Sequence, residues 1–262
     1  IILIMADDFG YEGLGCNGGQ SYATPEIDKL AETGMRFENC YSQPLCTPSR
    51  VQIMTGRYNF RNYKMFGYLH PGEITFGNVL KEAGYATCIA GKWQLGNGIE
   101  SPFHNGFDEY CLWQIYALEA GKDARGPRYA DPKVYVNGEI KENTTGNYGP
   151  DIFVDFINDF VRQNKDNPFF VYYPMVLTHD PFFPTPDSKE WEEDRHKKDK
   201  KFFKDMVEYM DKSVGRIVAN LEELGLRENT LIIFTGDNGS PIPVKSQWND
   251  EWIQGGKSLT TD

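Results

Sequence analysis

Two pairs of oxygen-bearing side chains follow apolar runs near opposite ends of the chain. Asp7 and Asp8 come directly after the first such run. Asp237 and Asn238 follow the last one in the same way. Because open α/β sheets bind ligands at the carboxyl ends of their strands, we expect these four groups to meet there. Either pair alone is consistent with a solvated turn, but together they supply the oxygen donors that Ca²⁺ or Mg²⁺ prefers.

Cys46 opens the pentapeptide Cys-Thr-Pro-Ser-Arg, which ends at Arg50. Thr47 is predicted to cap a helix whose first residue is Pro48, so that Cys46 lies just outside the positive end of the helix. A nucleophile there faces the field that stabilises bound oxyanions. Arg50 lies about one turn further on and adds a permanent cation. Taken alone, the pentapeptide also fits a plain turn before an ordinary helix.

Three more polar side chains are candidates for the same site. Lys92 follows the apolar run 86–90, and His179 follows the run 169–174. Lys257 ends a Gly-Gly-Lys segment near the end of the chain. A lysine is a point charge suited to sulfate or phosphate oxygens, and a histidine can transfer a proton near neutral pH. Each of them alone would more often be an ordinary surface or structural residue.

The elements that must position these residues alternate along the chain. Apolar runs predict strands at 1–6, 86–90, 169–174 and 230–235, a further strand at 35–41 and a small hairpin at 134–140. Helices are predicted at 25–33, 76–83, 151–164 and 203–224, the last with the clearest apolar stripe. This alternation predicts an α/β fold with a mainly parallel central sheet and helices on both faces. The stretch 97–150 is rich in Gly and Pro and is expected to form long surface loops.

Composition limits the classes of function. The chain has 262 residues, of which 40% are hydrophobic, and no linker divides it, so we expect one globular domain spanning 1–262. A net charge of −11 argues against binding duplex nucleic acid through a broad basic face. No run approaches the ~18 apolar residues of a membrane span. The five cysteines lack zinc-site spacing and are expected to be free, buried thiols, although the spacing also leaves room for one disulfide.

The order of these segments resembles that of the type I, formylglycine-dependent sulfatases of the alkaline phosphatase superfamily. The matching motifs are Asp-Asp after the first strand, Cys-x-Pro-x-Arg followed by Thr-Gly-Arg, Gly-Lys-Trp-x-Leu-Gly, Thr-His-x-Pro, Asp-Asn-Gly and Gly-Gly-Lys. They run from Asp7 to Lys257, which is essentially the whole chain. Six short agreements in the same order are far more specific than any one of them.

This resemblance implies a role for each candidate residue. Cys46 would be oxidised by a formylglycine-generating enzyme, and its hydrated aldehyde would be the nucleophile that attacks sulfur. The residues that would hold a Ca²⁺ or Mg²⁺ ion are Asp7, Asp8, Asp237, Asn238 and residue 46 itself. Arg50 would steady the formylglycine, and Lys92 and Lys257 would hold the sulfate oxygens. His179 would protonate the leaving-group oxygen or donate a hydrogen bond to it.

Gln94 departs from the family pattern. Most members have a histidine at this position, which contacts the formylglycine and is thought to assist release of sulfate. Glutamine forms hydrogen bonds but does not shuttle a proton at neutral pH. We therefore expect a working enzyme with an altered second step, in which sulfated enzyme accumulates.

The resemblance also implies features outside the motifs. Family members continue past the Gly-Gly-Lys segment into a smaller C-terminal subdomain, so we expect this chain to be the N-terminal portion of the catalytic domain. The chain opens inside an apolar run, and a signal peptide would precede it. A periplasmic, secreted or lysosomal location fits the family. The expected substrate is a sulfated carbohydrate or an aryl sulfate.

Three alternatives stay open at this point. A hydrolase of the same superfamily could act on a phosphomonoester, phosphodiester or phosphonate, because phosphate and sulfate oxygens look alike to a lysine and a cation. A relative that binds sulfated glycans without hydrolysing them would also keep the pocket. Residues 13–18 match the Gly-x-Gly-x-x-Gly pattern of dinucleotide enzymes, but they follow no strand directly and open no predicted helix.

Overall fold

The computed structural model describes residues 1–115 and 126–259. Its central sheet has seven strands in the order β5-β4-β3-β2-β6-β1-β7. The strands are β1 (Ile2–Ala6), β2 (Ala86–Lys92), β3 (Glu109–Trp113), β4 (Val134–Val136), β5 (Glu139–Ile140), β6 (Phe169–Pro174) and β7 (Ile232–Gly236). Each pair of neighbouring strands in the series β3-β2-β6-β1-β7 is parallel. Strands β4 and β5 form an antiparallel hairpin at one edge of the sheet. The predicted α/β class and its mainly parallel sheet are confirmed.

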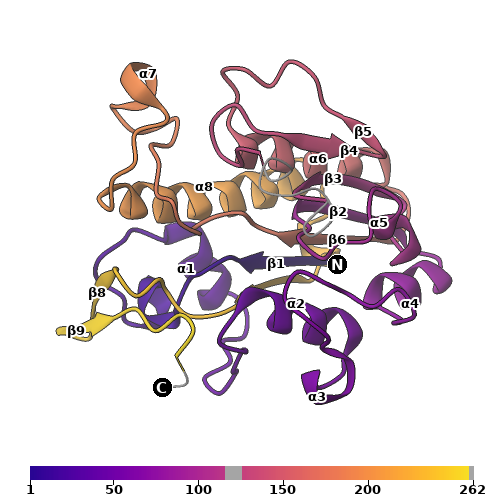
Figure 1. Cartoon of the computed structure of the whole chain (residues 1–262), viewed down its shortest axis with the longest axis horizontal. Helices are drawn as coiled ribbons and strands as arrows, with labels where there is room; N and C mark the ends of the chain where they lie inside the picture. The colour runs from indigo at the N-terminus through magenta and orange to yellow at the C-terminus, as the bar shows by residue number, and fades with distance from the viewer. Residues whose placement is uncertain (116–125, 260–262) are drawn as a thin grey trace.

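Helices cover both faces of this sheet (Figure 1). They are α1 (Pro25–Glu32), α2 (Cys46–Thr55), α3 (Asn59–Asn62), α4 (Phe76–Glu82), α5 (Ser101–His104), α6 (Gly149–Gln163), α7 (Trp191–Asp194) and α8 (Phe202–Glu223). In Figure 1, α6 and α8 lie above the sheet and α2, α3 and α4 lie below it. Among the described residues, no helix is both long and apolar enough to cross a membrane.

The alternation of side chains along β1 explains why the sheet needs two helical layers. Ile2 and Ile4 are fully buried in a core that they share with α6 and α8. Leu3 and Met5 point to the opposite face, where they share a second core with Val51 of α2. Since successive side chains of a strand point to opposite faces, a strand that is apolar throughout must be covered on both.

Some predicted elements were wrong or missing. The segment 35–41 forms no strand, and three of its apolar side chains are more than 70% exposed: Met35, Phe37 and Tyr41. Strand β3 was missed, as was a second sheet formed by β8 (Lys245–Trp248) and β9 (Glu251–Gln254). Strands β8 and β9 carry Lys, Gln and Glu side chains that hide the apolar alternation, whereas β3 is a short apolar run inside the stretch 97–150 that was expected to form loops. Residues 116–125, which belong to the stretch 97–150 expected to form long surface loops, and residues 260–262 lie outside the described ranges.

The predicted hairpin at 134–140 is confirmed as β4 and β5. The Gly-x-Gly-x-x-Gly segment, residues 13–18, starts at the end of one short 3₁₀ helix, η1 (Tyr11–Gly13), and contains a second, η2 (Gly15–Asn17). A dinucleotide site requires a long helix that opens directly after a strand, so this alternative is not supported. All five cysteines lie in the described ranges and are free thiols, as predicted, but only three of them are buried, because Cys16 is half-buried and Cys40 is exposed.

Candidate active site

Four neighbouring strands, in the order β2, β6, β1 and β7, end at residues that the sequence singled out. Lys92 is the last residue of β2, and Asp7 directly follows β1. Asp237 directly follows β7, and His179 lies in the loop after β6. These strands are parallel, so all four residues emerge at the same edge of the sheet. The topology therefore brings together groups from the two ends and the middle of the chain.

The two acidic segments form a buried cluster of oxygen atoms. Asp7, Asp8, Asp237 and Asn238 are each at most 3% exposed. The backbone N–H of Asp8 donates to Asp237 Oδ1 at 3.1 Å. One oxygen each of Asp7, Asp8 and Asn238 (Oδ1) is buried without a hydrogen-bond partner among the described residues. An unsatisfied buried polar atom costs roughly 1–3 kcal/mol, so these three oxygens are suited to bind a cation.

The charges in this cluster also fit a divalent cation. Burial, with the charge of Asp7, raises the pKa of Asp8 and of Asp237. Burial opposes ionisation of Asp7 as well, but the neighbouring cations, Lys92 first, hold the pKa of Asp7 below its usual range. One ligand atom from each of Asp7, Cys46 and Asp237 lies within 4.8 Å of the others. Carboxylate and amide oxygens in this arrangement match the preference of Ca²⁺ and Mg²⁺.

Cys46 is the first residue of α2, because the residue before it, Leu45, has an extended backbone and is the N-cap. The prediction that Thr47 caps the helix with Cys46 outside it is therefore wrong. Thr47 is already helical, and its Oγ1 accepts a hydrogen bond from the backbone N–H of Gly67 at 3.1 Å. The Cys46 side chain is buried, and burial raises the pKa of its thiol. The unmodified thiol is accordingly neutral and a weak nucleophile.

Arg50 and Lys92 are cations buried beside Cys46 and the acidic cluster. The Arg50 Nη2 donates to the backbone oxygen of Lys92 at 2.6 Å. The Lys92 Nζ donates to Asp7 Oδ2 at 2.7 Å. Each of the two cations is 1% exposed, and the Nε and Nη1 of Arg50 have no hydrogen-bond partner in the described part of the chain. A buried guanidinium with unused donors can bind an oxygen-rich group close to residue 46.

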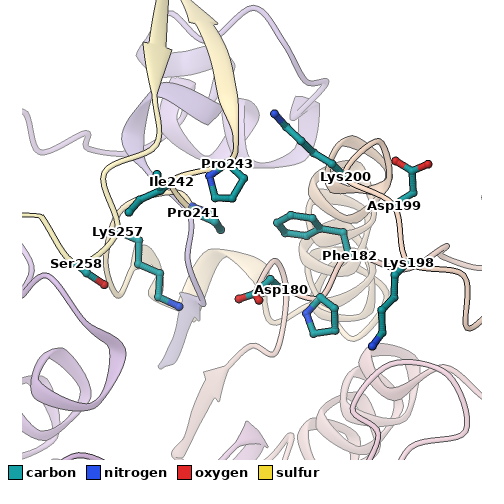
Figure 2. A pocket seen from close by; sticks show the side chains of 11 residues that line it. Asp180, Phe182, Lys198, Asp199, Lys200, Pro241, Ile242, Pro243, Lys257 and Ser258 are labelled. Carbon is teal, nitrogen blue, oxygen red and sulfur yellow. The ribbon is translucent and has the colours of Figure 1, made fainter.

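Lys257 reaches the cluster from the far end of the chain. Its Nζ pairs with Asp8 Oδ2, 249 positions away, and lies 3.1 Å from His179 Nε2. The backbone N–H of Lys257 donates to the Ser240 oxygen at 3.0 Å, which fixes the start of the side chain. Figure 2 shows the stem of Lys257 lining a pocket that it shares with Asp180.

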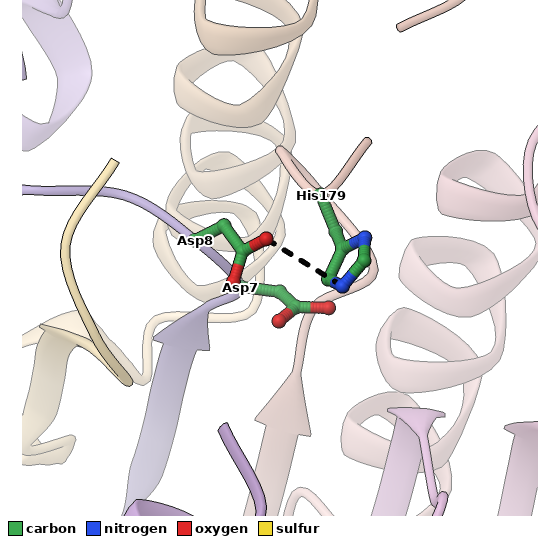
Figure 3. Close-up of side chains that lie close together, drawn as sticks. All are labelled: Asp7, Asp8 and His179. Carbon is green, nitrogen blue, oxygen red and sulfur yellow. Dashed lines mark ion pairs between the residues drawn. The ribbon is translucent and has the colours of Figure 1, made fainter. Parts of the chain in front are cut away.

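His179 lies between the acidic cluster and this lysine. Its Nε2 lies 3.5 Å from Asp8 Oδ2 (Figure 3). Its Nδ1 lies 2.6 Å from the backbone oxygen of Asp180. A carbonyl only accepts, so we assign the ring hydrogen to Nδ1, which leaves Nε2 to accept from Lys257. Burial lowers the pKa of His179 although Asp7 opposes this, in agreement with a neutral ring.

Tyr129, which the sequence did not single out, fixes the loop that carries His179. Its hydroxyl lies 2.7 Å from the oxygen of Val176 and 2.5 Å from the oxygen of His179. The side chain is 2% exposed, so the hydroxyl bonds only within the protein. No motif marks this residue, because its role depends on a contact 50 positions along the chain.

Arg128 is a further cation that the sequence reasoning missed. Its guanidinium stacks on Trp113 with 4.1 Å between its central carbon and the ring centroid. Its Nη1 lies 4.0 Å from Asp7 Oδ2 and is buried without a hydrogen-bond partner among the described residues. Arg128 sits in a loop rather than at a strand end, so the strand-end argument could not find it.

Gln94 lies beside Cys46, as predicted for the position that departs from the family. Its Oε1 is 3.9 Å from Cys46 Sγ. Its backbone N–H donates at 3.0 Å to the oxygen of Gln114, which follows β3 and is 1% exposed. Because β3 was missed in the sequence, Gln114 was missed as well. The position of Gln114 directly after a strand is the signal from which it could have been predicted.

Comparisons with known proteins identify the family to which the chain is similar. The family model described as Sulfatase matches residues 1–261. The chain is 34% identical to human arylsulfatase A over 273 residues, which cover 91% of this chain and 52% of that protein. It is 31% identical to mouse N-acetylgalactosamine-6-sulfatase over 278 residues, which cover 92% of this chain and 50% of that protein.

Among solved structures, the chain is similar to the crystal structure of Ps i-CgsB in complex with k-i-k-neocarrahexaose. The TM-score is 0.78 at 28% identity, and the match covers 92% of this chain and 59% of that one. A phosphonate monoester hydrolase of Agrobacterium radiobacter matches with a TM-score of 0.66 at 17% identity, a likeness of fold alone. The chain spans about half the length of the curated relatives it matches.

Proposed function

The chain belongs to the sulfatase family, and on that basis we propose that the protein hydrolyses sulfate esters of carbohydrates. The observation that carries the proposal is the cluster at the ends of β1 and β7, where three buried oxygens lack hydrogen-bond partners among the described residues. Lys92, Lys257 and the buried Cys46 surround this cluster. A sulfate ester needs its nonbridging oxygens neutralised and its alcohol released, and these groups serve both needs.

Each residue has a defined role in this proposal. Asp7, Asp8, Asp237 and Asn238 would hold a Ca²⁺ or Mg²⁺ ion, which polarises the sulfate when bound. Residue 46, oxidised to formylglycine by a formylglycine-generating enzyme, would supply the nucleophile and a further ligand, with Arg50 as its support. Lys92 and Lys257 would bind sulfate oxygens, and His179 would assist the leaving alcohol.

Relatives guide the choice of substrate. Mouse N-acetylgalactosamine-6-sulfatase is named for a sulfated amino sugar, and Ps i-CgsB was crystallised with a hexasaccharide. We therefore favour a sulfated glycan over a simple aryl sulfate as the natural substrate. Export to the periplasm, the lysosome or the cell exterior is part of the same proposal.

The test is a desulfation screen of the full-length, matured protein against sulfated glycans, an aryl sulfate and the matching aryl phosphate. We expect release of inorganic sulfate from at least one glycan. Faster turnover of the phosphate ester would assign the protein to the phosphoester hydrolases instead. Glycan binding without turnover, with an unmodified Cys46 thiol by mass spectrometry after co-expression with the maturation enzyme, would indicate a nonhydrolytic relative.

Replacing Tyr129 with phenylalanine is expected to lower kcat several-fold, because the His179 loop loses its hydrogen-bonded anchor. The loss of one buried hydrogen bond costs about 1 kcal/mol of stability. Tyr22→Phe is the matched control, since the Tyr22 hydroxyl bonds Ser246 at 2.9 Å and touches no candidate site residue. Steady-state kinetics should separate the two variants. Equal kcat values for them would reject a positioning role for Tyr129.

Replacing Gln94 with histidine is expected to speed release of sulfate, because histidine can transfer a proton where glutamine cannot. In single-turnover experiments with an aryl sulfate, sulfated enzyme should accumulate in the parent protein and decay faster in the variant. Gln94→Ala should release sulfate no faster than the parent. Absence of any sulfated species in the parent, with an unchanged rate in Gln94→Ala, would show that this position does not limit the second step.

A further inference from the structure

A pocket of about 470 Å³ opens beside the candidate active site (Figure 2). This volume is within the range of roughly 300–1,000 Å³ that ligand pockets occupy. Four separate segments line it: 180–182 after β6, 198–200 before α8, 241–243 before β8, and 257–258 after β9. Only Lys257 of these residues has a role in the proposed reaction, so the remainder of the pocket needs its own explanation.

The pocket is continuous with the site through two residues. Lys257 lines the pocket with its stem, while its Nζ contacts Asp8 and His179. Asp180 also lines the pocket and is adjacent in sequence to His179, whose Nδ1 lies 3.2 Å from its Oδ1. A sulfate group held by Lys257 would thus place the attached molecule at the mouth of this pocket. The pocket is on the side of the leaving group, because His179 lies at the same border.

The acidic side chains around the pocket have partners, whereas two of its lysines form no ion pair within the described ranges. Its two acids have partners, since Asp180 faces His179 and Asp199 accepts a hydrogen bond from the backbone N–H of Lys201 at 3.0 Å. Lys198 and Lys200 are exposed, and within the described ranges neither forms an ion pair. The Lys198 ammonium lies over the Phe183 ring, 5.9 Å from its centroid. Figure 2 shows the two ammonium groups extending away from each other at the rim of the pocket, so each is a separate cation available to a ligand there.

The wall between these charges is apolar and rigid. Phe182 is 8% exposed and packs edge-on against Phe203 of α8 with 5.2 Å between the ring centroids. Its backbone oxygen accepts from the N–H of Asp199 at 3.2 Å, which joins the 198–200 segment to this wall. Pro241 and Ile242 face it across the pocket (Figure 2). Apolar walls with a few placed cations suit a sugar ring that carries an anionic substituent.

We propose that this pocket binds a saccharide that carries a second anionic group, a sulfate or a carboxylate, which Lys198 or Lys200 recognises at the rim. The proposal rests on the proposed function, in that the scissile sulfate is held at Lys257. A neutral aryl group would fill the apolar wall but would leave both ammonium groups unused. The net charge of the chain is −11, which disfavours the approach of an anion. The positive charges of Lys198 and Lys200 would let a doubly charged substrate approach this pocket.

The test is a binding measurement on the full-length Cys46→Ala protein, which cannot mature and so does not consume its ligand. The probes are a disaccharide without uronic acid that carries one sulfate group and the same disaccharide with two, titrated by calorimetry in Ca²⁺ buffer. The test variant is Lys198→Gln/Lys200→Gln. The control is Lys197→Gln/Lys204→Gln, which removes the same charge from exposed lysines that do not line the pocket.

The unsubstituted pocket is expected to bind the doubly sulfated disaccharide about tenfold more tightly than the singly sulfated one. The test variant should lose most of this preference, and the control should keep it. An unchanged preference in the test variant would overturn the proposal, as would tighter binding of 4-nitrophenyl sulfate than of either disaccharide, or no binding of either. If the matured protein releases no sulfate but the preference depends on Lys198 and Lys200, the proposed reaction fails and the pocket assignment stands.

Discussion

Replacing Cys46 with alanine is expected to lower kcat/KM of the full-length, matured protein for an aryl sulfate by about 1,000-fold or more. Cys46 begins α2 and is the proposed source of the nucleophile, and losing a nucleophile removes the covalent route altogether. The side chain is small and buried, so the fold should tolerate alanine with a loss of stability of about 1 kcal/mol. Kinetics and urea denaturation of the same preparation separate the two effects.

Cys40→Ala is the matched control, because Cys40 is an exposed thiol close in sequence to Cys46. This variant should keep the activity of the parent. Mass spectrometry of the parent should find the aldehyde at residue 46 and a thiol at residue 40. Retention of most activity by Cys46→Ala would eliminate formylglycine at this position, whatever the fate of the other cysteines.

Replacing Asp237 with asparagine is expected to weaken Ca²⁺ binding, and with it activity, by at least about 100-fold. The variant keeps the shape of the side chain but removes one of three buried carboxyl groups that lie next to each other. Burial and the charge of Asp7 already disfavour ionisation of Asp237, as its raised pKa indicates. Without metal, the variant should therefore be at least as stable as the parent.

Thermal unfolding with and without Ca²⁺ provides a readout that does not depend on turnover. At 100 times the Kd, a bound ion adds about 2.7 kcal/mol of stability, so the Tm of the parent should rise with Ca²⁺ and that of Asp237→Asn should not. Asp166→Asn, at an exposed position before β6, should respond like the parent. A full Ca²⁺ response in Asp237→Asn would exclude Asp237 from the metal site. A metal-free variant less stable than the metal-free parent would argue against charge repulsion in the cluster.

The sequence alone determined which local elements form and which residues end them. Runs such as 169–174 are apolar throughout, and a strand of this kind is stable only inside a covered sheet, so the α/β class could be predicted. The polar residues that follow these strands had to emerge at the carboxyl edge of the sheet. Where apolar and polar residues mix, as in β8, the local signal failed. The short apolar run of β3 was missed among the loops expected at 97–150, and Gln114 was lost with it.

Only the tertiary structure decided which strands are neighbours. The order β2-β6-β1-β7 places Lys92, His179, Asp7 and Asp237 side by side, and no local pattern encodes that order. The contacts that complete the site join distant positions, such as Lys257 with Asp8 and Tyr129 with the His179 loop. Hydrogen bonds, ion pairs and shared burial between such positions depend on how the whole chain packs. For that reason, Arg128 and the pocket beside Lys257 became visible only in the folded protein.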